Sequence, residues 1–327
     1  MSKLKQFDKE QISRFLLKVN FKKFNLYPNV TQDELINYLV NDLSEIFKSG
    51  KIFTSSFNNE IIALAALKVL YWDTQHYGYT CASIDYIFLN CEVDDNSAHK
   101  YLQKLVCEIE NYANSKQIKF MSANISACEN ITSSILQDYN FKYVLTWLDG
   151  MFQSKKKLPV IYEDSEVGLV KESELEHFQI MASTSYFKGG RFYLDSNFDD
   201  NAVNQMYFKL IMSSYQNEDI LLVYRIKGEP VGLFICKKII KNEYFDNLKV
   251  APLRYLLVDS ASRQKNIGYD LFAKTLNYLM DYSDIITTGF EVHNLPSLNL
   301  HKKLNFQFNY AHNVYHWWAK ENPGVTG

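Results

Sequence analysis

The order of predicted helices and strands occurs twice along this chain of 327 residues, and this repeat constrains the fold more than any other feature. Apolar residues at helical or alternating spacing predict, in each half, helical sequence followed by a hairpin, a strand, a helix, a strand, a helix and a last strand. Helices that alternate with strands and hairpins indicate an α/β (α+β) fold with mixed, mostly antiparallel sheets flanked by helices. We therefore expect two domains of similar architecture.

The expected elements have the following bounds. In the first half, helices are expected over residues 32–47, 97–115 and 131–138, and strands over residues 51–56, 60–70, 82–89, 120–126 and 141–152. In the second half, helices are expected over residues 175–186, 201–215, 268–281 and 296–304, and strands over residues 220–225, 231–240, 254–259, 285–292 and 306–318. Asn96 or Ser97 is the expected N-cap of the helix that ends at residue 115.

A charged run that ends in a proline lies between the two halves, Ser154-Lys155-Lys156-Lys157-Leu158-Pro159. Charged residues followed by proline are typical of a linker. The predicted domains are therefore residues 1–157 and 158–327. The alternative is that the run is a solvated loop inside one domain.

Composition and charge exclude several classes of protein. With 47% hydrophobic residues and a formal net charge of −2, the chain can bury large cores and lacks the basic stripe of a nucleic-acid binder. No run of roughly 18 apolar residues is present, so we expect no membrane span. The five cysteines form no CxxC pair, which predicts no metal site, and the charged start of the chain is unlike a secretory signal. These features predict a cytoplasmic protein.

One segment of the second half has the pattern of an anion site. The apolar strand expected over residues 254–259 leads into a basic loop that carries Arg263 and Lys265, and a helix follows from about Gly268. The first turn of a helix presents free N–H groups and the positive end of the helix dipole, which suits a pyrophosphate. The alternative is an ordinary strand, loop and helix with cations on the surface.

Here the chain resembles the GNAT superfamily of acyl-CoA-dependent N-acyltransferases. The acyl-CoA loop of that family, Arg/Gln-x-x-Gly-x-Gly/Ala after a strand ending in Val, corresponds to the segment from Arg263 to Gly268 after Val258. The later family motif corresponds to Asn294, Ser297, His301 and the pair Asn305-Phe306. The sequence departs from the family pattern at Asn266 and Asn305, which replace glycines, and at His301, which stands where tyrosine is usual.

The resemblance implies tandem GNAT-like domains, with the acyl-CoA co-substrate bound by the second half only and with no metal. The implied acyl-CoA contacts are Leu257, Val258, Arg263, Gln264, Lys265, Asn266, Ile267, Gly268, Tyr269 and Asn294. His301 is the implied proton donor to the departing thiolate, and its alternative role is packing. The first half is expected to be degenerate, because Glu92, Asp94 and Asp95 stand where a pyrophosphate would lie.

Within this superfamily the chain is similar to two-domain enzymes that N-acylate dTDP-linked amino-dideoxy sugars. That similarity rests on the segments 72–78, 190–192 and 315–318, and it implies substrate contacts at Trp72, Asp73, Arg191 and His316 between the domains. The expected reaction transfers an acetyl or short hydroxyacyl group to the sugar amine for synthesis of a surface polysaccharide such as O-antigen. The alternatives are a GNAT acting on an amino acid, peptide or antibiotic amine, and an acyl-CoA-binding protein without catalysis. The oligomeric state stays open.

Overall fold

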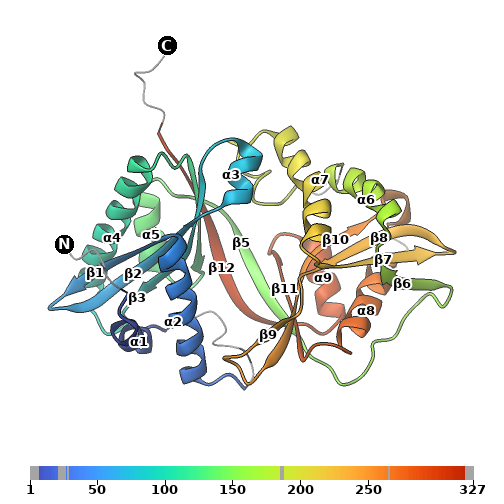
Figure 1. Cartoon of the computed structure of the whole chain (residues 1–327), viewed down its shortest axis with the longest axis horizontal. Helices are drawn as coiled ribbons and strands as arrows, with labels where there is room; N and C mark the ends of the chain where they lie inside the picture. The colour runs from blue at the N-terminus through green and yellow to red at the C-terminus, as the bar shows by residue number, and fades with distance from the viewer. Residues whose placement is uncertain (1–6, 21–26, 28, 185–187, 264–265, 321–327) are drawn as a thin grey trace, which may run out of the picture. The chain divides into compact units, whose positions relative to one another are not determined.

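The structure is a computed structural model that describes residues 7–20, 27, 29–184, 188–263 and 266–320. The chain forms two compact units, of which unit 1 comprises residues 1–146 and 311–327 and unit 2 comprises residues 147–310. Each unit is a mixed sheet flanked by helices (Figure 1). The domain division expected from the sequence, at residues 157 and 158, stays a prediction.

Unit 1 has the strand order β1-β2-β3-β4-β12. Its helices are α1 (Lys9–Leu17), α2 (Gln32–Ser49), α3 (Tyr71–Tyr77), α4 (Asp95–Ser115) and α5 (Asn130–Asp138), and its strands are β1 (Lys51–Phe57), β2 (Glu60–Val69), β3 (Cys81–Leu89), β4 (Phe120–Ser126) and most of β12 (Gln307–Trp318). Strands β3 and β4 are parallel, whereas β1 with β2, β2 with β3, and β4 with β12 are antiparallel.

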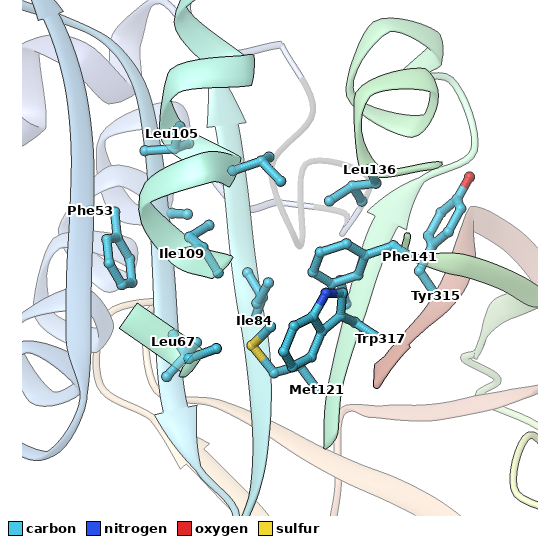
Figure 2. Close-up of a cluster of buried hydrophobic side chains, with 14 of the residues drawn as sticks. Phe53, Leu67, Ile84, Leu105, Ile109, Met121, Leu136, Phe141, Tyr315 and Trp317 are labelled. Atoms are coloured by element: carbon cyan, nitrogen blue, oxygen red, sulfur yellow. The ribbon is translucent and has the colours of Figure 1, made fainter. Parts of the chain in front are cut away.

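The helices of unit 1 cover both faces of its sheet (Figure 1). Thr31 and Glu34 form a capping box at the start of α2, whose buried residues recur at helical spacing. On the opposite face, Leu105 and Ile109 of α4 pack over β2 and β3, and the same cluster includes Leu136 of α5 (Figure 2). Trp317 of β12 lies in this core although it is far away along the chain.

Unit 2 has the strand order β5-β11-β10-β8-β7-β6, with β9 paired to β10. Its helices are η1 (Glu172–Glu174), α6 (Leu175–Ser183), α7 (Asp200–Gln216), η2 (Ser260–Ser262), α8 (Ile267–Leu279) and α9 (Leu295–Lys303), and its strands are β5 (Lys142–Phe152), β6 (Ser165–Leu169), β7 (Ile220–Ile226), β8 (Glu229–Cys236), β9 (Ile240–Asn242), β10 (Leu248–Val258) and β11 (Ile285–Glu291). Alternate residues of β7 and β8 face α6 and α7 on one side and α8 on the other.

Two strands pass from one unit to the other. Residues 142–146 of β5 belong to unit 1 and its remaining residues pair with β11 in unit 2. Residues 311–318 of β12 belong to unit 1, where residues 312–318 pair with β4. The strand that completes the sheet of unit 1 therefore comes from the end of the chain.

Most of the expected elements are confirmed, with small shifts of their ends. Strand β4 has the expected bounds, whereas β10 begins at Leu248 rather than at residue 254. The expected N-cap of α4 is wrong, because Asp94 caps the helix by accepting a hydrogen bond from the Ser97 N–H. The strand expected over residues 60–70 is β2 and ends at Val69, and a helix that was not expected, α3, begins at Tyr71.

Candidate active site

Strands β10 and β11 of unit 2 pair over only part of their length. Their parallel pairing spans Val250–Pro252 and Ile285–Thr287, although β10 continues to Val258 and β11 to Glu291. In the pairing of β10 with β8 there is a bulge at Arg254, two residues after the last residue of β10 that pairs with β11. Beyond Pro252 the facing backbone edges of the two strands are not paired with each other, so an extended ligand with its own amide groups can pair with them.

Helix α8 begins just after the end of β10 and has an open first turn. Its N-cap, Asn266, has a left-handed backbone with φ of 55° and makes no capping hydrogen bond through its side chain to the described residues. Apart from its chain neighbours and the backbone of its own helix, no described residue has an atom within 4 Å of the place where a Cβ of Gly268 would be. Among the described residues, the positive end of the α8 dipole thus has no side-chain cap, and an uncapped helix N-terminus is a place where anions bind.

Arg263 is exposed beside this helix end and its Nε donates to the Val258 carbonyl oxygen at 3.3 Å. Leu257 is buried in the core that includes residues of α7 and β8. Ile267, the first residue of α8, is buried in the core on the other face of the sheet, and Tyr269 is half-buried. Gln264 and Lys265 lie outside the described residues. The assignment of these residues and of Val258 to acyl-CoA binding stays a prediction.

The corresponding helix of unit 1 has a different N-terminus. Strands β3 and β4 also pair in parallel over a short stretch, Cys81–Ile84 with Phe120–Ala123, with a bulge at Asp85. The Asp94 carboxylate accepts from the Ser97 N–H at 3.0 Å and from the Ser97 hydroxyl at 2.7 Å, and these bonds lower the pKa of Asp94. The N-terminus of α4 therefore has a carboxylate cap, whereas the N-cap of α8 makes no such side-chain bond to the described residues.

A cluster of polar side chains lies at the end of β11. The carboxyl group of Glu291 is hydrogen-bonded by Asn294 and lies near His293 and Arg191, while burial raises its pKa above the ordinary value. His293 Nε2 lies 3.0 Å from the carbonyl oxygen of Gly189, which ties the loop before α7 to the end of β11. A carboxylate with a raised pKa is a candidate proton acceptor.

A stack of tyrosine rings lies beside this cluster. The ring of Tyr207 on α7 stacks on Tyr193 at 5.8 Å and on Tyr255 of β10 at 5.5 Å. Burial and the neighbouring Glu291 carboxylate raise the pKa of Tyr207, so its hydroxyl stays protonated. The stack thus reaches from β10 to Glu291 on β11, at the level where the two strands diverge.

The sequence analysis did not select Glu291 or Tyr207. Glu291 closes an apolar strand and precedes His293 and Asn294, and this was the signal available in the sequence. Tyr207 gave no signal, because one aromatic residue on a helix is ordinary core sequence.

His301 on α9 is buried among aromatic rings. Its ring stacks on Phe290 at 4.4 Å and meets Phe272 and Phe306 edge-on. Nε2 lies 3.0 Å from the Thr288 hydroxyl, and Nδ1 lies 2.8 Å from the Ser297 carbonyl oxygen. Burial lowers the pKa of His301 to about 4, so the ring is neutral at neutral pH. This geometry favours the packing role over donation of a proton from an imidazolium.

The other residues expected to bind substrate belong to both units. Trp72 and Asp73 lie on α3 of unit 1, where the Trp72 ring stacks on His76. His316 lies on β12 in unit 1, is 1% exposed and meets Phe120 edge-on. Arg191 lies in unit 2 with its guanidinium 4.6 Å from the Phe192 ring. Their joint role in one substrate site stays a prediction.

Asn294 has a local structural role. Its Oδ1 accepts from the Ser297 N–H at 3.2 Å and so caps α9, and its side chain also bonds to Glu291. Among the described residues, no group of three His, Cys, Asp or Glu side chains has the arrangement of a metal site. None of the described helices combines the length and the apolar character needed to cross a membrane.

The comparisons with known proteins agree with this geometry. Residues 188–306 match the model of the Acetyltransferase (GNAT) family. No curated protein matches the chain.

Several solved structures share the fold at identities so low that they show the fold alone. A GCN5-related N-acetyltransferase from Sphaerobacter thermophilus has a TM-score of 0.60 at 10% identity, covering 89% of this chain and 87% of its own. A tandem GNAT protein from the clavulanic acid biosynthesis pathway has a TM-score of 0.56 at 9% identity, covering 96% and 97%.

A third structure is the glucosamine N-acetyltransferase region of a fungal multi-domain β-N-acetylglucosaminidase, with a TM-score of 0.57 at 11% identity, covering 95% of this chain and 37% of that one. The expected fold class, an α/β chain with tandem GNAT-like architecture, is confirmed. Residues 188–306, which contain α8, β11 and the Glu291 cluster, therefore match the GNAT acetyltransferase family within a chain that has the fold of tandem GNAT proteins.

Proposed function

We propose that the chain is a GNAT-type acyltransferase that transfers an acyl group from acyl-CoA to a primary amine. The observation that carries this proposal is the open N-terminus of α8 beside the diverging strands β10 and β11, within the segment that matches the family. The helix end supplies N–H groups for a pyrophosphate. The unpaired strand edges supply partners for the amide groups of the pantetheine arm.

The acyl-CoA site belongs to unit 2 in this proposal. Arg263 and Lys265 supply positive charge, Asn266, Ile267, Gly268 and Tyr269 form the first turn, and Leu257 and Val258 supply main-chain groups beside the thioester. In this proposal unit 1 does not bind acyl-CoA, because the Asp94 carboxylate already accepts a hydrogen bond from the first turn of α4 and would repel a pyrophosphate.

We propose further that the amine that accepts the acyl group belongs to a dTDP-linked amino-dideoxy sugar. Support comes from the glucosamine N-acetyltransferase named in one structural relative and from Arg191, whose guanidinium can pair with a diphosphate. Trp72 and His316 are proposed contacts of the same substrate. The second candidate acceptor is the amine of an amino acid, peptide or antibiotic, and the similarity to a tandem GNAT protein from the clavulanic acid biosynthesis pathway supports it. Binding of acyl-CoA without transfer is the remaining alternative.

The reversal of one charge tests the acyl-CoA site. Arg263→Glu should weaken CoA binding by about 1–3 kcal/mol, because one charge-assisted hydrogen bond is lost and a carboxylate replaces it. Calorimetric titration of CoA measures the effect, and Lys227→Glu in the turn between β7 and β8 is the matched control. Equal CoA affinity in wild type and Arg263→Glu would remove this loop from the site.

Turnover tests the reaction itself. We expect release of a free thiol when the protein is incubated with acetyl-CoA or a hydroxyacyl-CoA and a panel of amines that includes dTDP- and UDP-linked amino sugars, lysine and glucosamine. Tight CoA binding with no thiol release across the panel would support binding without catalysis.

A further inference from the structure

The bulge in β10 places two consecutive side chains on the same face of the sheet of unit 2. Arg254 Nη1 donates to the Ser214 hydroxyl of α7 at 3.1 Å, and the ring of Tyr255 stacks on Tyr207 of the same helix. The residue before them, Leu253, packs instead against the core that includes residues of α8. Because the side chains of a regular strand alternate between its two faces, Arg254 is the extra residue of this strand.

Arg254 also faces a buried carboxylate. Asp219, whose side chain is 4% exposed, lies between the end of α7 and the start of β7, and its Oδ2 is 3.4 Å from Arg254 Nη1. The same oxygen lies 3.3 Å from Nζ of Lys237, the residue after β8. A carboxylate that is removed from water needs such cations, because an unpaired buried charge is costly. Asp219 therefore ties the bulge of β10 to the segments where α7 and β8 end.

The bulge lies where β10 leaves β11. Pro252 is the last residue of β10 that pairs with β11, and Arg254 follows two residues later. A bulge bends its strand and increases the local twist. Loss of the contacts that hold the extra residue would let β10 straighten and continue alongside β11. The strand edges that the proposed pantetheine site uses would then pair with each other.

We propose that Arg254 is a positioning residue for acyl-CoA, because its contacts with Asp219 and Ser214 hold the bulge of β10 against α7 and so keep β10 and β11 apart. This inference rests on the proposed acyl-CoA site and adds a residue that controls its shape. Arg254 acts on the ligand through the backbone of β10. Its replacement should therefore weaken acyl-CoA binding even though the residues of the α8 N-terminus are unchanged.

Deletion of Arg254 tests the bulge directly. The flanking residues Leu253 and Tyr255 pair with Cys236 and Ile235, which are themselves consecutive, so the deletion leaves the pairing with β8 in register. The CoA affinity of the whole chain, measured by calorimetric titration, should fall about 10- to 100-fold, the size of effect that a displacement of about 1 Å produces. A folded deletion variant with the wild-type CoA affinity would overturn the proposal.

Arg254→Met tests the ion pair while the bulge residue is still present. CoA affinity should fall about tenfold, and Arg254→Lys, which keeps a cation opposite Asp219, should recover part of the loss. The matched control is Arg225→Met on β7, because Arg225 is 4% exposed and pairs with Glu174 of η1 at 2.7 Å. This control should unfold at lower urea concentration but bind CoA like the wild type. An equal loss of CoA affinity in the control would show a general effect of lost stability and would contradict the assignment.

Hydrogen exchange without any ligand separates this inference from the proposed function. In the deletion variant, exchange of amide groups in residues 255–258 and 288–291 should slow, because paired strand edges protect the amides between them. Slower exchange in this variant, together with a wild type that does not bind CoA, would contradict the acyl-CoA site and support the role of Arg254 in holding the strands apart. Tight CoA binding by the wild type with unchanged exchange in the variant would support the site and overturn the role of Arg254.

Discussion

His301 is held by contacts that keep its ring neutral. Both ring nitrogens have partners, one on β11 and one on α9, and three phenylalanine rings surround it. It packs directly against Phe290, the residue before Glu291. At this position a histidine supports the end of β11, where the candidate proton acceptor lies.

The lowered pKa of His301 makes stability depend on pH. The unfolded chain binds a proton at His301 near pH 6.5, and the folded chain does so only near pH 4. Between these values the unfolded state holds more protons, so the free energy of unfolding should decrease by about 3 kcal/mol as the pH falls from 6.5 to 4. Urea unfolding across this range measures the slope.

His301→Asn is the matching variant, because asparagine does not titrate. Its free energy of unfolding should be lower at neutral pH but should lack this part of the acid dependence. A packing role also predicts that its pH–rate profile keeps the alkaline behaviour of the wild type. Loss of the alkaline limb together with a 10- to 100-fold lower kcat would instead support the proton donor that the resemblance implies.

At the scale of elements, α8 is fixed by the segment that precedes β6. Asp270, fully buried in the first turns of α8, accepts hydrogen bonds from the Tyr224 hydroxyl at 2.8 Å and from Ser165 Oγ at 3.1 Å, and from the Ile161 N–H. Lys274 lies 3.6 Å from Asp270 and donates to the Tyr162 carbonyl oxygen. This network holds the helix whose N-terminus is the proposed pyrophosphate site.

Removal of the Asp270 charge should destabilise unit 2. Asp270→Asn leaves Lys274 buried without its counter-charge, so we expect the free energy of unfolding to fall by about 3–5 kcal/mol. Urea denaturation measures this loss. Addition of Lys274→Met should restore part of it, because the unpaired charge is removed; a double variant no more stable than Asp270→Asn would contradict the explanation.

Helices and strands could be predicted from the sequence more accurately than contacts between side chains. Periodicity located α2, α4, β4 and α8 to within a few residues, because a buried face repeats at the spacing of its own helix or strand. Helix α3 was missed, since Tyr71–Tyr77 has no buried residue and so no apolar period. The N-cap of α4 was misplaced by two or three residues, because Asp94, Asn96 and Ser97 are all good caps and only the backbone decides between them.

Part of the candidate site could be predicted because its residues follow one another along the chain. A strand, a loop and a helix start are local in sequence, so the α8 end could be located from residues 254–268. Glu291, Tyr207 and Gly190 come from three separate segments, and only the folded chain brings them together. The buried Asp270 likewise depends on residues more than 40 positions away.

At the scale of the molecule, the chain order and the compact units do not coincide. The sheet of unit 1 ends with β12, whose residues 312–318 pair with β4, so the last strand of the chain belongs to the first unit. Tyr315 and Trp317 are each 2% exposed in the core that α4 and α5 cover. The sequence repeat does not reveal that β12 belongs to unit 1. In the repeat, β5 and β12 occupy equivalent positions, because each is the last strand of its half and each follows a helix.

The exchange predicts that the first half of the chain does not fold alone. The fragment 1–157 lacks β12, and loss of a buried tryptophan and tyrosine together costs about 6–10 kcal/mol, which is comparable with the whole stability of a domain. The fragment should therefore lack near-UV circular dichroism and a cooperative urea transition. Residues 1–146 joined to 311–320 by a short Gly/Ser linker should recover both. The join is feasible because Thr146 donates to the Asn313 side chain at 2.8 Å, so the two ends lie close together. Cooperative unfolding of fragment 1–157 would show that β12 is dispensable to the unit whose sheet it completes.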